Sequence, residues 1–321
     1  MSTPLVETRG LKKYFGTPKG MLHAVDGVDL SIAAGSTLGV VGESGCGKST
    51  LGRTILRLIE PTAGQILYNG EDIVTYSARQ MQNIRREMQI IFQDPFSSLN
   101  PRMTVSDIIA EPIRVCGLCR SREEMYDKVD RLMETVGLAQ RFENSYPHEL
   151  DGGRRQRIGI ARALAVDPKF IVCDEPVSAL DVSIQAQILN LLMDLQENMG
   201  LTYMFITHDL SVVKHISTEI AVMYLGQCVE RAPAQRLFEN PLHPYTRALL
   251  AAIPVPRLIP RDKGMGIIRG EVSNPIDPKP GCRFANRCPE AAERCRAADL
   301  PLIERESGHF VACALCEEAK E

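Results

Sequence analysis

The sequence of 321 residues predicts an α/β protein built around a parallel β-sheet. Three observations support this fold class. Residues 37–58 have the pattern of a strand, a glycine-rich loop and a helix; residues 170–206 have the pattern of strand, helix and strand; and residues from about 101 to 165 show helical periodicity. Because 44% of the residues are hydrophobic, the chain can form one large domain or two smaller ones with apolar cores.

The N-terminal region is expected to form antiparallel β-structure. Residues from about 5 to 35 alternate between apolar and polar side chains and contain glycine at the expected turns between strands. A further strand ends at Asn69-Gly70, a dipeptide that suits a tight hairpin turn. These patterns predict an antiparallel β region before and after the first glycine-rich loop.

A phosphate-binding loop follows the apolar strand at residues 37–41. Its residues fit the pattern Gly-x-x-x-x-Gly-Lys-[Ser/Thr] and are Gly42, Glu43, Ser44, Gly45, Cys46, Gly47, Lys48, Ser49 and Thr50. Glycines let successive backbone N–H groups converge on phosphate oxygens at the start of the following helix. Lys48 can reach the β- and γ-phosphates, and the Ser49 hydroxyl can bind Mg²⁺. The sequence therefore predicts a binding site for a nucleoside triphosphate.

Polar side chains directly follow three further apolar strands. In an open parallel sheet, ligands bind beyond the carboxyl ends of the strands, where these side chains are expected to lie. We expect Asp174 to bind Mg²⁺ and Glu175 to polarise the attacking water. His208 is placed to contact the γ-phosphate, and Gln93 is placed to reach both Mg²⁺ and the water.

The C-terminal region has a different composition. After about residue 254, proline and glycine are frequent, which predicts a small separate module on a semi-rigid linker. Its cysteines have the spacing C-x5-C-x6-C-x17-C, and four thiolates can bind one soft metal centre, either zinc or an iron–sulfur cluster. The predicted ligands are Cys282, Cys288, Cys295 and Cys313, with Cys316 or His309 as alternatives for the fourth. By contrast, the isolated C-x-x-C at residues 116–119 carries no comparable signal.

The charge and hydropathy of the chain exclude several functions. A net charge of −3 and a pI of about 6.1 provide no basic surface for nucleic acid. The N-terminus lacks the pattern of a secretory leader, and no apolar run approaches the roughly 18 residues of a membrane span. We expect a soluble, cytosolic protein that can still bind to a membrane complex.

The motifs together resemble those of the ATP-binding-cassette (ABC) ATPases of membrane transporters. The resemblance covers residues from about 5 to 255 and includes, in order, the phosphate-binding loop, Gln93, Leu150-Asp-Gly-Gly-Arg154, Asp174-Glu175, Ser178-Ala-Leu-Asp181 and His208. It implies a P-loop NTPase cassette, with a RecA-like parallel-sheet core, an antiparallel β subdomain and a helical signature subdomain at about 96–165. The nucleotide-binding domain would span residues 1–255 and the small Cys-rich C-terminal module residues 256–321.

The resemblance also implies how the nucleotide is bound. Two cassettes would face each other head to tail, with each ATP between the phosphate-binding loop of one and the signature of the other. The implied nucleotide contacts include Asp181 and the signature residues Asp151, Gly152, Gly153 and Arg154. An aromatic residue would stack on adenine, and Phe15 fits best by position, with Tyr14 as the alternative.

The signature departs from the usual Leu-Ser-Gly-Gly-Gln of the family. Asp151 replaces a serine whose hydroxyl donates to the γ-phosphate across the dimer, whereas a carboxylate repels that phosphate. At 4 Å this repulsion is about 1 kcal/mol in water and about 4 kcal/mol at an effective dielectric constant of 20. Either Arg154 pairs with Asp151 and leaves a working signature, or the ATP site that this chain completes in a partner is weak. We favour the weak site, which requires a partner ATPase of different sequence.

Together, these observations predict that the chain is the ATP-hydrolysing subunit of a peptide importer at the cytoplasmic face of the cell membrane. Residues 240–250 resemble the tail of oligopeptide, dipeptide and nickel importer ATPases, so nickel or a metal chelate is the alternative cargo. A soluble ABC regulator with a metal-sensing tail is a further alternative. The family implies two transmembrane permease subunits, an extracytoplasmic substrate-binding protein and a [4Fe–4S] cluster on the C-terminal cysteines, with Zn²⁺ as the other candidate. Coupling to the permeases is expected at residues 96–101.

Overall fold

The computed structural model describes residues 4–253 and 275–316, and it contains two compact units. The first unit combines Met1–Ala33, Thr37–Val74 and Ile206–Glu321, and the second combines Ala34–Ser36 with Thr75–Phe205. The first unit therefore carries the phosphate-binding loop and the C-terminal segment (residues 275–316). The second unit carries the signature and the acidic strand end at Asp174.

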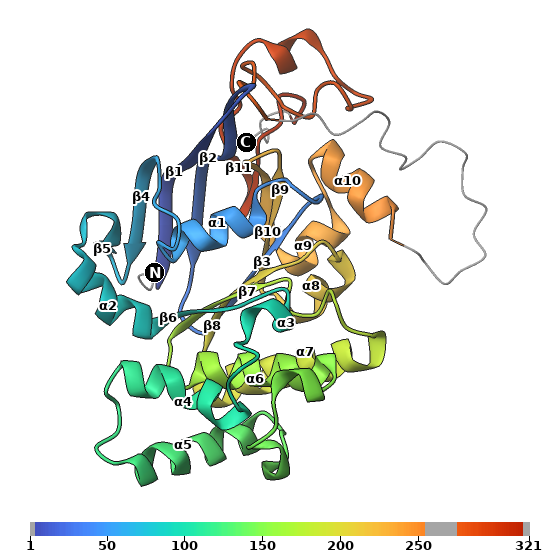
Figure 1. Ribbon diagram of the computed structural model, residues 1–321. Coiled ribbons are helices and arrows are strands. Elements are labelled where there is room, and N and C mark those ends of the chain that lie inside the picture. Colours follow the sequence, from blue (N-terminus) through green and yellow to red (C-terminus); the bar gives the residue numbers. More distant parts are fainter. Residues whose placement is uncertain (1–3, 254–274, 317–321) are drawn as a thin grey trace, which may run out of the picture. The chain divides into compact units, whose positions relative to one another are not determined.

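The first unit contains the predicted antiparallel sheet. Its strands are β1 (Val6–Thr17), β2 (Gly20–Ile32), β4 (Ala63–Tyr68) and β5 (Glu71–Asp72), in the order β2-β1-β4-β5 (Figure 1). β1 pairs antiparallel with both β2 and β4. The turn between β4 and β5 has Asn69 at φ 50° and Gly70 at φ 84°, as a tight hairpin turn of the predicted kind requires. The antiparallel region and the Asn-Gly turn are therefore confirmed.

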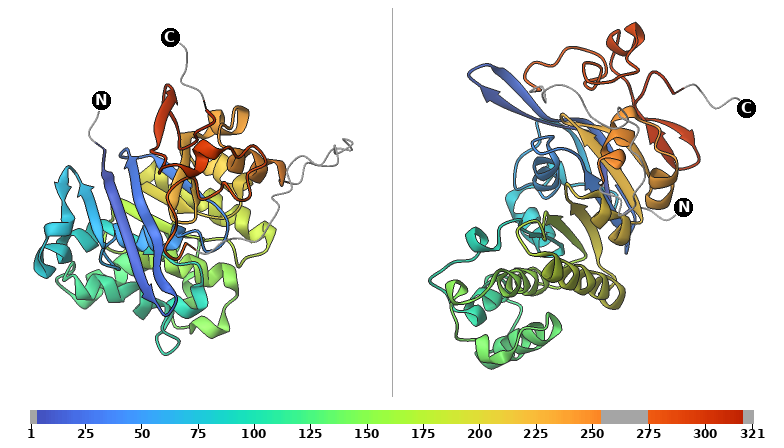
Figure 2. Two further views of the ribbon diagram at one scale, coloured as in Figure 1. Left: turned by 90° about the horizontal axis from the view of Figure 1, so that it is seen from above. Right: turned by 90° about the vertical axis from the view of Figure 1, so that its right-hand side faces the viewer.

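A second group of strands in the first unit begins with β3 (Thr37–Val41), which pairs in parallel with β9 (Glu219–Tyr224). From β9 the order continues through β10 (Gln227–Pro233) and β12 (His309–Val311) to β11 (Ile303–Glu306). The C-terminal segment thus extends this sheet, because Val311 pairs with Glu230 of β10 (Figure 2).

Among the described residues of the first unit, five segments are helical. They are α1 (Lys48–Ile55), which follows the phosphate-binding loop, α8 (Leu210–Ile216), α9 (Ala234–Glu239), α10 (Pro244–Ala251) and the short 3₁₀ helix η4 (Glu293–Arg296). A second 3₁₀ helix, η1 (Ile73–Thr75), lies where the chain passes to the other unit.

The second unit contains the other predicted strands and most of the helical residues. β6 (Met88–Ile91) pairs in parallel with β7 (Phe170–Asp174), which neighbours β8 (Thr202–Ile206). Its helices are α2 (Ala78–Glu87), α3 (Pro95–Ser98), α4 (Val105–Val115), α5 (Arg122–Thr135), α6 (Gly152–Leu164) and α7 (Val182–Met199), with 3₁₀ turns η2 (Gln140–Phe142) and η3 (Pro147–Glu149). The strand–helix–strand unit and the helical region predicted from periodicity are confirmed.

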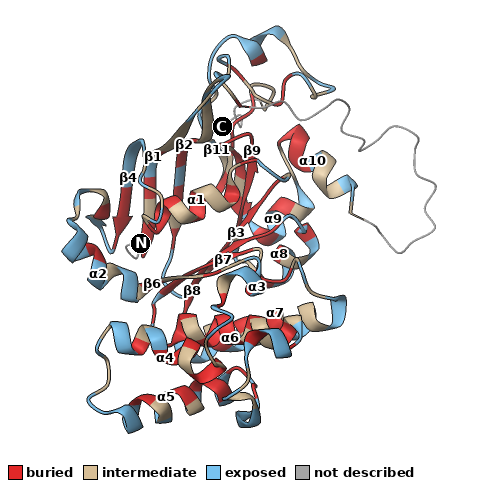
Figure 3. Cartoon of the chain, viewed as in Figure 1, coloured by how far each residue is buried: buried red, intermediate tan, exposed pale blue. Residues whose placement is uncertain are grey.

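The buried residues follow the apolar runs of the sequence. Every residue of β3, β7 and β8 is buried, as Figure 3 shows by colour. Continuous rather than alternating apolar residues are typical of strands covered on both faces. The amphipathic helix α4 likewise buries Ile108, Ile109 and Ile113.

The predicted boundary at residues 255–256 lies in 254–274, outside the described residues, so the domain limits remain a prediction. Within 4–253 and 275–316, none of the helices has the length and hydrophobicity that a membrane span requires.

Candidate nucleotide-binding site

The phosphate-binding loop has a backbone that only glycine can adopt at its key positions. Gly42, Gly45 and Gly47 have φ values of 152°, 77° and 102°. A Cβ atom at Gly42 would lie 2.2 Å from the carbonyl oxygen of Met223, and one at Gly47 would lie 2.0 Å from that of Ala24. A side chain at either position would push the loop away from its strands. The loop geometry therefore fits a motif whose backbone approaches phosphate closely.

Lys48 lies at the start of α1 with its ammonium group inside this loop. Its side chain is buried, and Nζ donates to the carbonyl oxygens of Gly42 at 2.8 Å and Glu43 at 2.9 Å. The first turn of α1 contains no acidic residue, and its N-cap Gly47 has no side chain to occupy the helix N–H groups. These groups, together with the helix dipole, favour an anion at this end. The residues present thus fit the triphosphate predicted from the sequence.

Glu43, the second residue of the loop, is contacted by two residues that the sequence analysis did not identify as site residues. Its backbone N–H donates to the Tyr245 hydroxyl at 2.9 Å. Its carboxylate accepts two hydrogen bonds from the Arg287 guanidinium, at 2.7 Å and 3.0 Å. Arg287 also donates to the Tyr224 hydroxyl at 3.2 Å. Tyr245 lies within the tail pattern at 240–250, but no local signal in the sequence connects residues 43 and 287.

The second unit positions the predicted catalytic carboxylates at the end of β7. Asp174 is its last residue and is 1% exposed, and Glu175 follows at φ 47°. A non-glycine residue in this left-handed region costs of order 1 kcal/mol or more, and such residues are concentrated at functional sites. Gln93, which follows β6, donates through Nε2 to Glu175 Oε2 at 3.0 Å. The structure thus brings together two residues that we expected at neighbouring strand ends.

The remaining catalytic candidate, His208, is exposed and lies in the first unit, directly before Asp209, which caps α8. The predicted site residues are therefore divided between the two units. Lys48 and His208 belong to one, and Gln93, Asp174 and Glu175 belong to the other. Their action on one nucleotide remains a prediction.

The signature residues form the start of α6. Asp151 is the N-cap, with Oδ1 accepting from the Arg154 N–H at 2.8 Å, a role in which aspartate is as strong as the serine usual at this position. The other carboxylate oxygen pairs with the Arg154 guanidinium at 2.6 Å, so the pairing required by the working-signature hypothesis is present. Gly153 packs tightly, since a Cβ atom there would lie 2.7 Å from Ile184. Asp181 caps α7 by accepting from the Ile184 N–H at 3.0 Å. The effect of the Asp151 pair on a partner's ATP site is still a prediction.

The two candidates for adenine stacking differ in their surroundings. Tyr14 stacks on His23 with ring centroids 3.9 Å apart, and its hydroxyl donates to Asp26. Burial and the Asp26 hydrogen bond raise the pKa of Tyr14. Phe15 is partly exposed, and the Lys13 ammonium lies 4.8 Å from its ring centroid. Because Tyr14 is engaged within its own unit, Phe15 remains the better candidate.

The C-terminal cysteines do not form a ready metal site. In the part of the chain that the structure describes, no group of three or more His, Cys, Asp or Glu side chains is arranged to hold a metal ion. Burial, together with the neighbouring Cys313, Cys288 and Cys295, raises the pKa of Cys282 to about 11. A hydrogen bond from Cys316 instead lowers the pKa of Cys313 to about 6.

His309, one alternative for the fourth ligand, already has a partner. Its Nε2 atom lies 2.7 Å from Glu230 Oε1, and both side chains are fully buried. The imidazole is therefore engaged in an ion pair or hydrogen bond inside the first unit, which argues against its use as a metal ligand through Nε2. Cys316 remains an alternative, with its thiol 3.8 Å from the Leu242 carbonyl oxygen.

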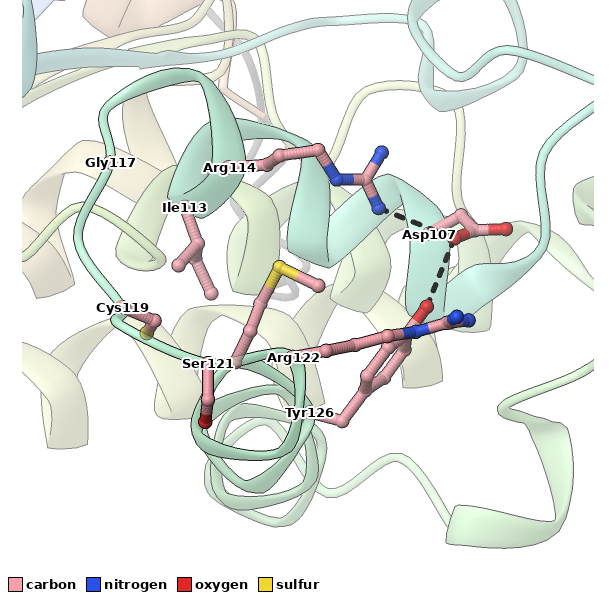
Figure 4. A pocket seen from close by; sticks show the side chains of 9 residues that line it. Asp107, Ile113, Arg114, Gly117, Cys119, Ser121, Arg122 and Tyr126 are labelled. Atoms are coloured by element: carbon pink, nitrogen blue, oxygen red, sulfur yellow. Dashed lines mark hydrogen bonds and ion pairs between the residues drawn. The ribbon is translucent and has the colours of Figure 1, made fainter.

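The hollows of the second unit include one of about 570 Å³ that is lined by residues of α2, α4 and α6. Two others also lie in its helical part. One, of about 470 Å³, lies between α4 and α5 (Figure 4). Its polar groups pair with one another, because Asp107 accepts from Tyr126 at 3.3 Å and lies 3.7 Å from Arg114. The other, of about 290 Å³, is lined by Asp151, Gly153, Arg154 and neighbouring residues of the second unit. Neither contains the phosphate-binding loop, so we do not assign the nucleotide to them.

Comparison with protein families gives two matches. The profile of the family described as "ABC transporter" matches residues 25–178, and that described as "Oligopeptide/dipeptide transporter, C-terminal region" matches residues 229–295. The first range contains the phosphate-binding loop, the signature and the end of β7. The second begins in β10 and ends at Cys295, so the two matches together include most of the candidate residues.

Individual relatives agree with these families. The chain is 51% identical over 319 residues to the putative oligopeptide transport ATP-binding protein YkfD of Bacillus subtilis, covering 99% of this chain and 97% of that protein. It is also 51% identical over 303 residues to the oligopeptide transport ATP-binding protein OppF of Salmonella typhimurium, covering 94% of this chain and 90% of OppF.

Solved structures show the same fold. The dimeric post-hydrolysis structure of the ATP-binding cassette MJ0796 with ADP and Pi has a TM-score of 0.65 at 29% identity, covering 71% of this chain and 98% of that chain. The structure of cbiO1 from Clostridium perfringens, part of the ABC transporter complex cbiONQ, has a TM-score of 0.66 at 26% identity, covering 74% of this chain and 92% of that chain.

Proposed function

The chain belongs to the ABC transporter family and is an ATPase, and from this premise we propose that it energises the import of peptides through a membrane transporter. The observation that carries the peptide assignment is the match of residues 229–295 to the C-terminal region of oligopeptide and dipeptide transporters. Relatives whose names specify oligopeptide transport align over nearly the whole chain, including this region.

At this chain's own nucleotide pocket, the phosphate-binding loop would hold the phosphates. Its backbone N–H groups would donate to phosphate oxygens, and Lys48 would contact the β- and γ-phosphates. Ser49, Gln93 and Asp174 would hold Mg²⁺, whose positive charge would offset charge on the transferring phosphoryl group. Phe15 would stack on the adenine ring.

Glu175 would act as the general base that orients the attacking water, and His208 would contact the γ-phosphate. The hydrogen bond between Gln93 and Glu175 supports this assignment, because it holds the carboxylate in one direction beyond β7. The same contact connects Glu175 to the start of α3, where Phe96 is 59% exposed. We therefore assign coupling to the permeases to residues 96–101.

The proposed assembly contains a second, non-identical ABC ATPase, two transmembrane permease subunits and an extracytoplasmic substrate-binding protein. This chain would lie at the cytoplasmic face of the membrane, with no nucleic-acid partner. Its signature would complete the partner's ATP site through Asp151, Gly152, Gly153 and Arg154. The Asp151–Arg154 pair neutralises the carboxylate in part, because both side chains are about half exposed to water.

We also propose that Cys282, Cys288, Cys295 and Cys313 bind a [4Fe–4S] cluster, with Zn²⁺ as the alternative. The donor set supports a soft metal, since four thiols lie in one segment of the chain. The thiols would have to converge further than they do in the structure. Iron and acid-labile sulfide analysis of anaerobically purified protein tests this, and the Cys282→Ser variant should lose both. Zinc alone in the wild type, or no metal at all, would refute the cluster.

The import function is tested with the complete transporter. The chain is co-expressed with its permeases and partner ATPase in vesicles, and ATP hydrolysis is measured with the substrate-binding protein empty or loaded with a peptide. We expect the peptide-loaded protein to stimulate hydrolysis several-fold. Stimulation only by nickel or a metal chelate would reassign the cargo, and hydrolysis indifferent to every loaded binding protein would contradict the import function.

A further inference from the structure

Glu43 introduces a carboxylate into a loop that must bind a highly charged anion. At position 43 it lies between two residues whose backbone surrounds the phosphates in a loop of this type. An unpaired carboxylate within about 4–6 Å of a phosphate would oppose binding, because like charges repel strongly where water is partly excluded. The molecule therefore needs a cation that neutralises Glu43 without occupying the phosphate position.

We propose that Arg287 is that cation and that it is a positioning residue for nucleotide binding by the phosphate-binding loop. The proposal rests on the ATPase function, and it assigns a role to a residue outside every nucleotide-binding motif. Arg287 belongs to the C-terminal segment, 244 residues from Glu43, and both lie in the first unit.

The Arg287 contact has the geometry of a strong ion pair. Two guanidinium nitrogens donate to the two carboxylate oxygens at 2.7 Å and 3.0 Å, and the side chains are only 7% and 22% exposed. Bidentate pairs of this kind are stronger and more directional than single-contact surface pairs. The Glu43 hydrogen bonds also raise the pKa of Arg287, so the guanidinium remains charged.

The contacts of Glu43 connect this pair to Lys48, the lysine of the phosphate-binding loop. The Glu43 carbonyl oxygen accepts from Lys48 Nζ at 2.9 Å, while the Glu43 N–H donates to the Tyr245 hydroxyl at 2.9 Å. The backbone of Glu43 is thus fixed on one side by Tyr245 and on the other by Lys48, and Arg287 fixes its side chain. Any displacement of Glu43 changes the position of an acceptor of the Lys48 ammonium.

Arg287 is itself fixed by packing and by a turn. Its guanidinium contacts Tyr224, which packs with Tyr245 and Phe284 at ring-centroid distances of 4.7 Å and 5.3 Å. The N–H groups of Arg287 and Cys288 both donate to the Phe284 carbonyl oxygen, at 2.8 Å and 2.9 Å. The turn that contains Cys288 therefore determines where Arg287 lies. Through this residue the C-terminal segment sets the affinity of the phosphate-binding loop.

The test is equilibrium binding of a fluorescent ATP analogue to the purified full-length chain. The variants are Arg287→Gln, Glu43→Gln and the double variant, with Arg236→Gln as the matched control. Arg236 lies on α9 and forms a surface ion pair with Glu306 at 2.8 Å. Thermal unfolding of each variant is measured alongside.

We expect Arg287→Gln to weaken binding about tenfold, because it leaves a carboxylate unpaired beside the phosphates. Glu43→Gln should weaken binding by only a few-fold, since it removes the opposing charge together with the pair. The double variant should match Glu43→Gln, and Arg287→Lys should restore part of the loss. The control should bind as the wild type does.

Wild-type affinity in a folded Arg287→Gln variant would overturn the proposal, and so would losses from the two single variants that simply add. If Arg287→Gln does not fold, the Tyr245→Phe variant tests whether the position of Glu43 affects nucleotide binding, because it removes only the hydroxyl that accepts from the Glu43 N–H. It should weaken binding with little change in unfolding temperature, and unchanged affinity would refute the positioning of Glu43. Failure of the wild type to bind any nucleotide would instead contradict the ATPase function on which this inference rests.

Discussion

Mild acid should destabilise this protein through His243, the N-cap residue of α10. The imidazole is 1% exposed, and its Nδ1 atom accepts a hydrogen bond from the Tyr245 N–H at 3.1 Å. Burial lowers the pKa of His243 to about 4, although the nearby Glu230 carboxylate favours the charged form, and Arg247 opposes it. A proton on Nδ1 would break the cap and place a charge in the core.

The size of the effect follows from the two pKa values. An unfolded histidine has a pKa of about 6.5, so between pH 6.5 and 4 the unfolded chain binds more protons than the folded one. The contribution of neutral His243 to the free energy of unfolding is present in full above pH 6.5 and is lost as the pH falls towards 4. At pH 5 the loss is about 2 kcal/mol relative to pH 7.5.

The assay compares thermal unfolding of the wild type and the His243→Asn variant between pH 7.5 and 5. Asparagine is a strong N-cap that does not titrate, so it keeps an acceptor for the start of α10. We expect the wild type to lose several degrees more than the variant over this range. Parallel losses in the two proteins would show that His243 does not titrate as its burial requires.

Three further substitutions test the nucleotide site. Asp151→Ser should raise turnover at the partner's ATP site at least about fivefold by removing repulsion from the γ-phosphate. If neither the affinity nor the rate at that site rises, the result favours the working-signature hypothesis. Phe15→Ala should weaken binding of an adenine nucleotide about five- to a hundredfold, as expected for a lost stacking contact; unchanged affinity would return the role to Tyr14. Gly47→Ala should abolish nucleotide binding, because its Cβ would lie 2.0 Å from the Ala24 carbonyl oxygen; a folded variant that still binds would contradict the loop geometry.

The parts of the fold predicted from sequence are those determined by local patterns. The runs that became β3, β7 and β8 are short and continuously apolar, and the structure buries every residue in them. The rule that functional side chains follow parallel strands also predicted that Gln93 and Glu175 each lie at a strand end, and the structure joins them by a hydrogen bond across 82 residues. β6 and β7 are neighbouring parallel strands, so the residues that follow them lie at the same edge of the sheet.

Long-range side-chain pairs could not be predicted in this way. Neither Arg287 nor Glu43 stands in a pattern that points to the other, because an ion pair across 244 residues depends on how the C-terminal segment packs. The cysteine spacing shows the opposite case. It predicted a shared metal centre, whereas the described thiols interact electrostatically without forming a group arranged to hold a metal. Spacing specifies the donors, and the bound metal itself would supply much of the energy that brings them together.

The most direct measurement of the central claim is single-site ATP hydrolysis in the assembled transporter. The partner ATPase carries an inactivating substitution at its own catalytic base, so that only this chain's pocket turns over, and Glu175→Gln is compared with the wild type. A general base contributes about 10²- to 10⁴-fold to the rate, so hydrolysis should fall by at least about a hundredfold while nucleotide affinity is kept. Undiminished hydrolysis in the Glu175→Gln complex would contradict the assignment of Glu175 and of the pocket built around it.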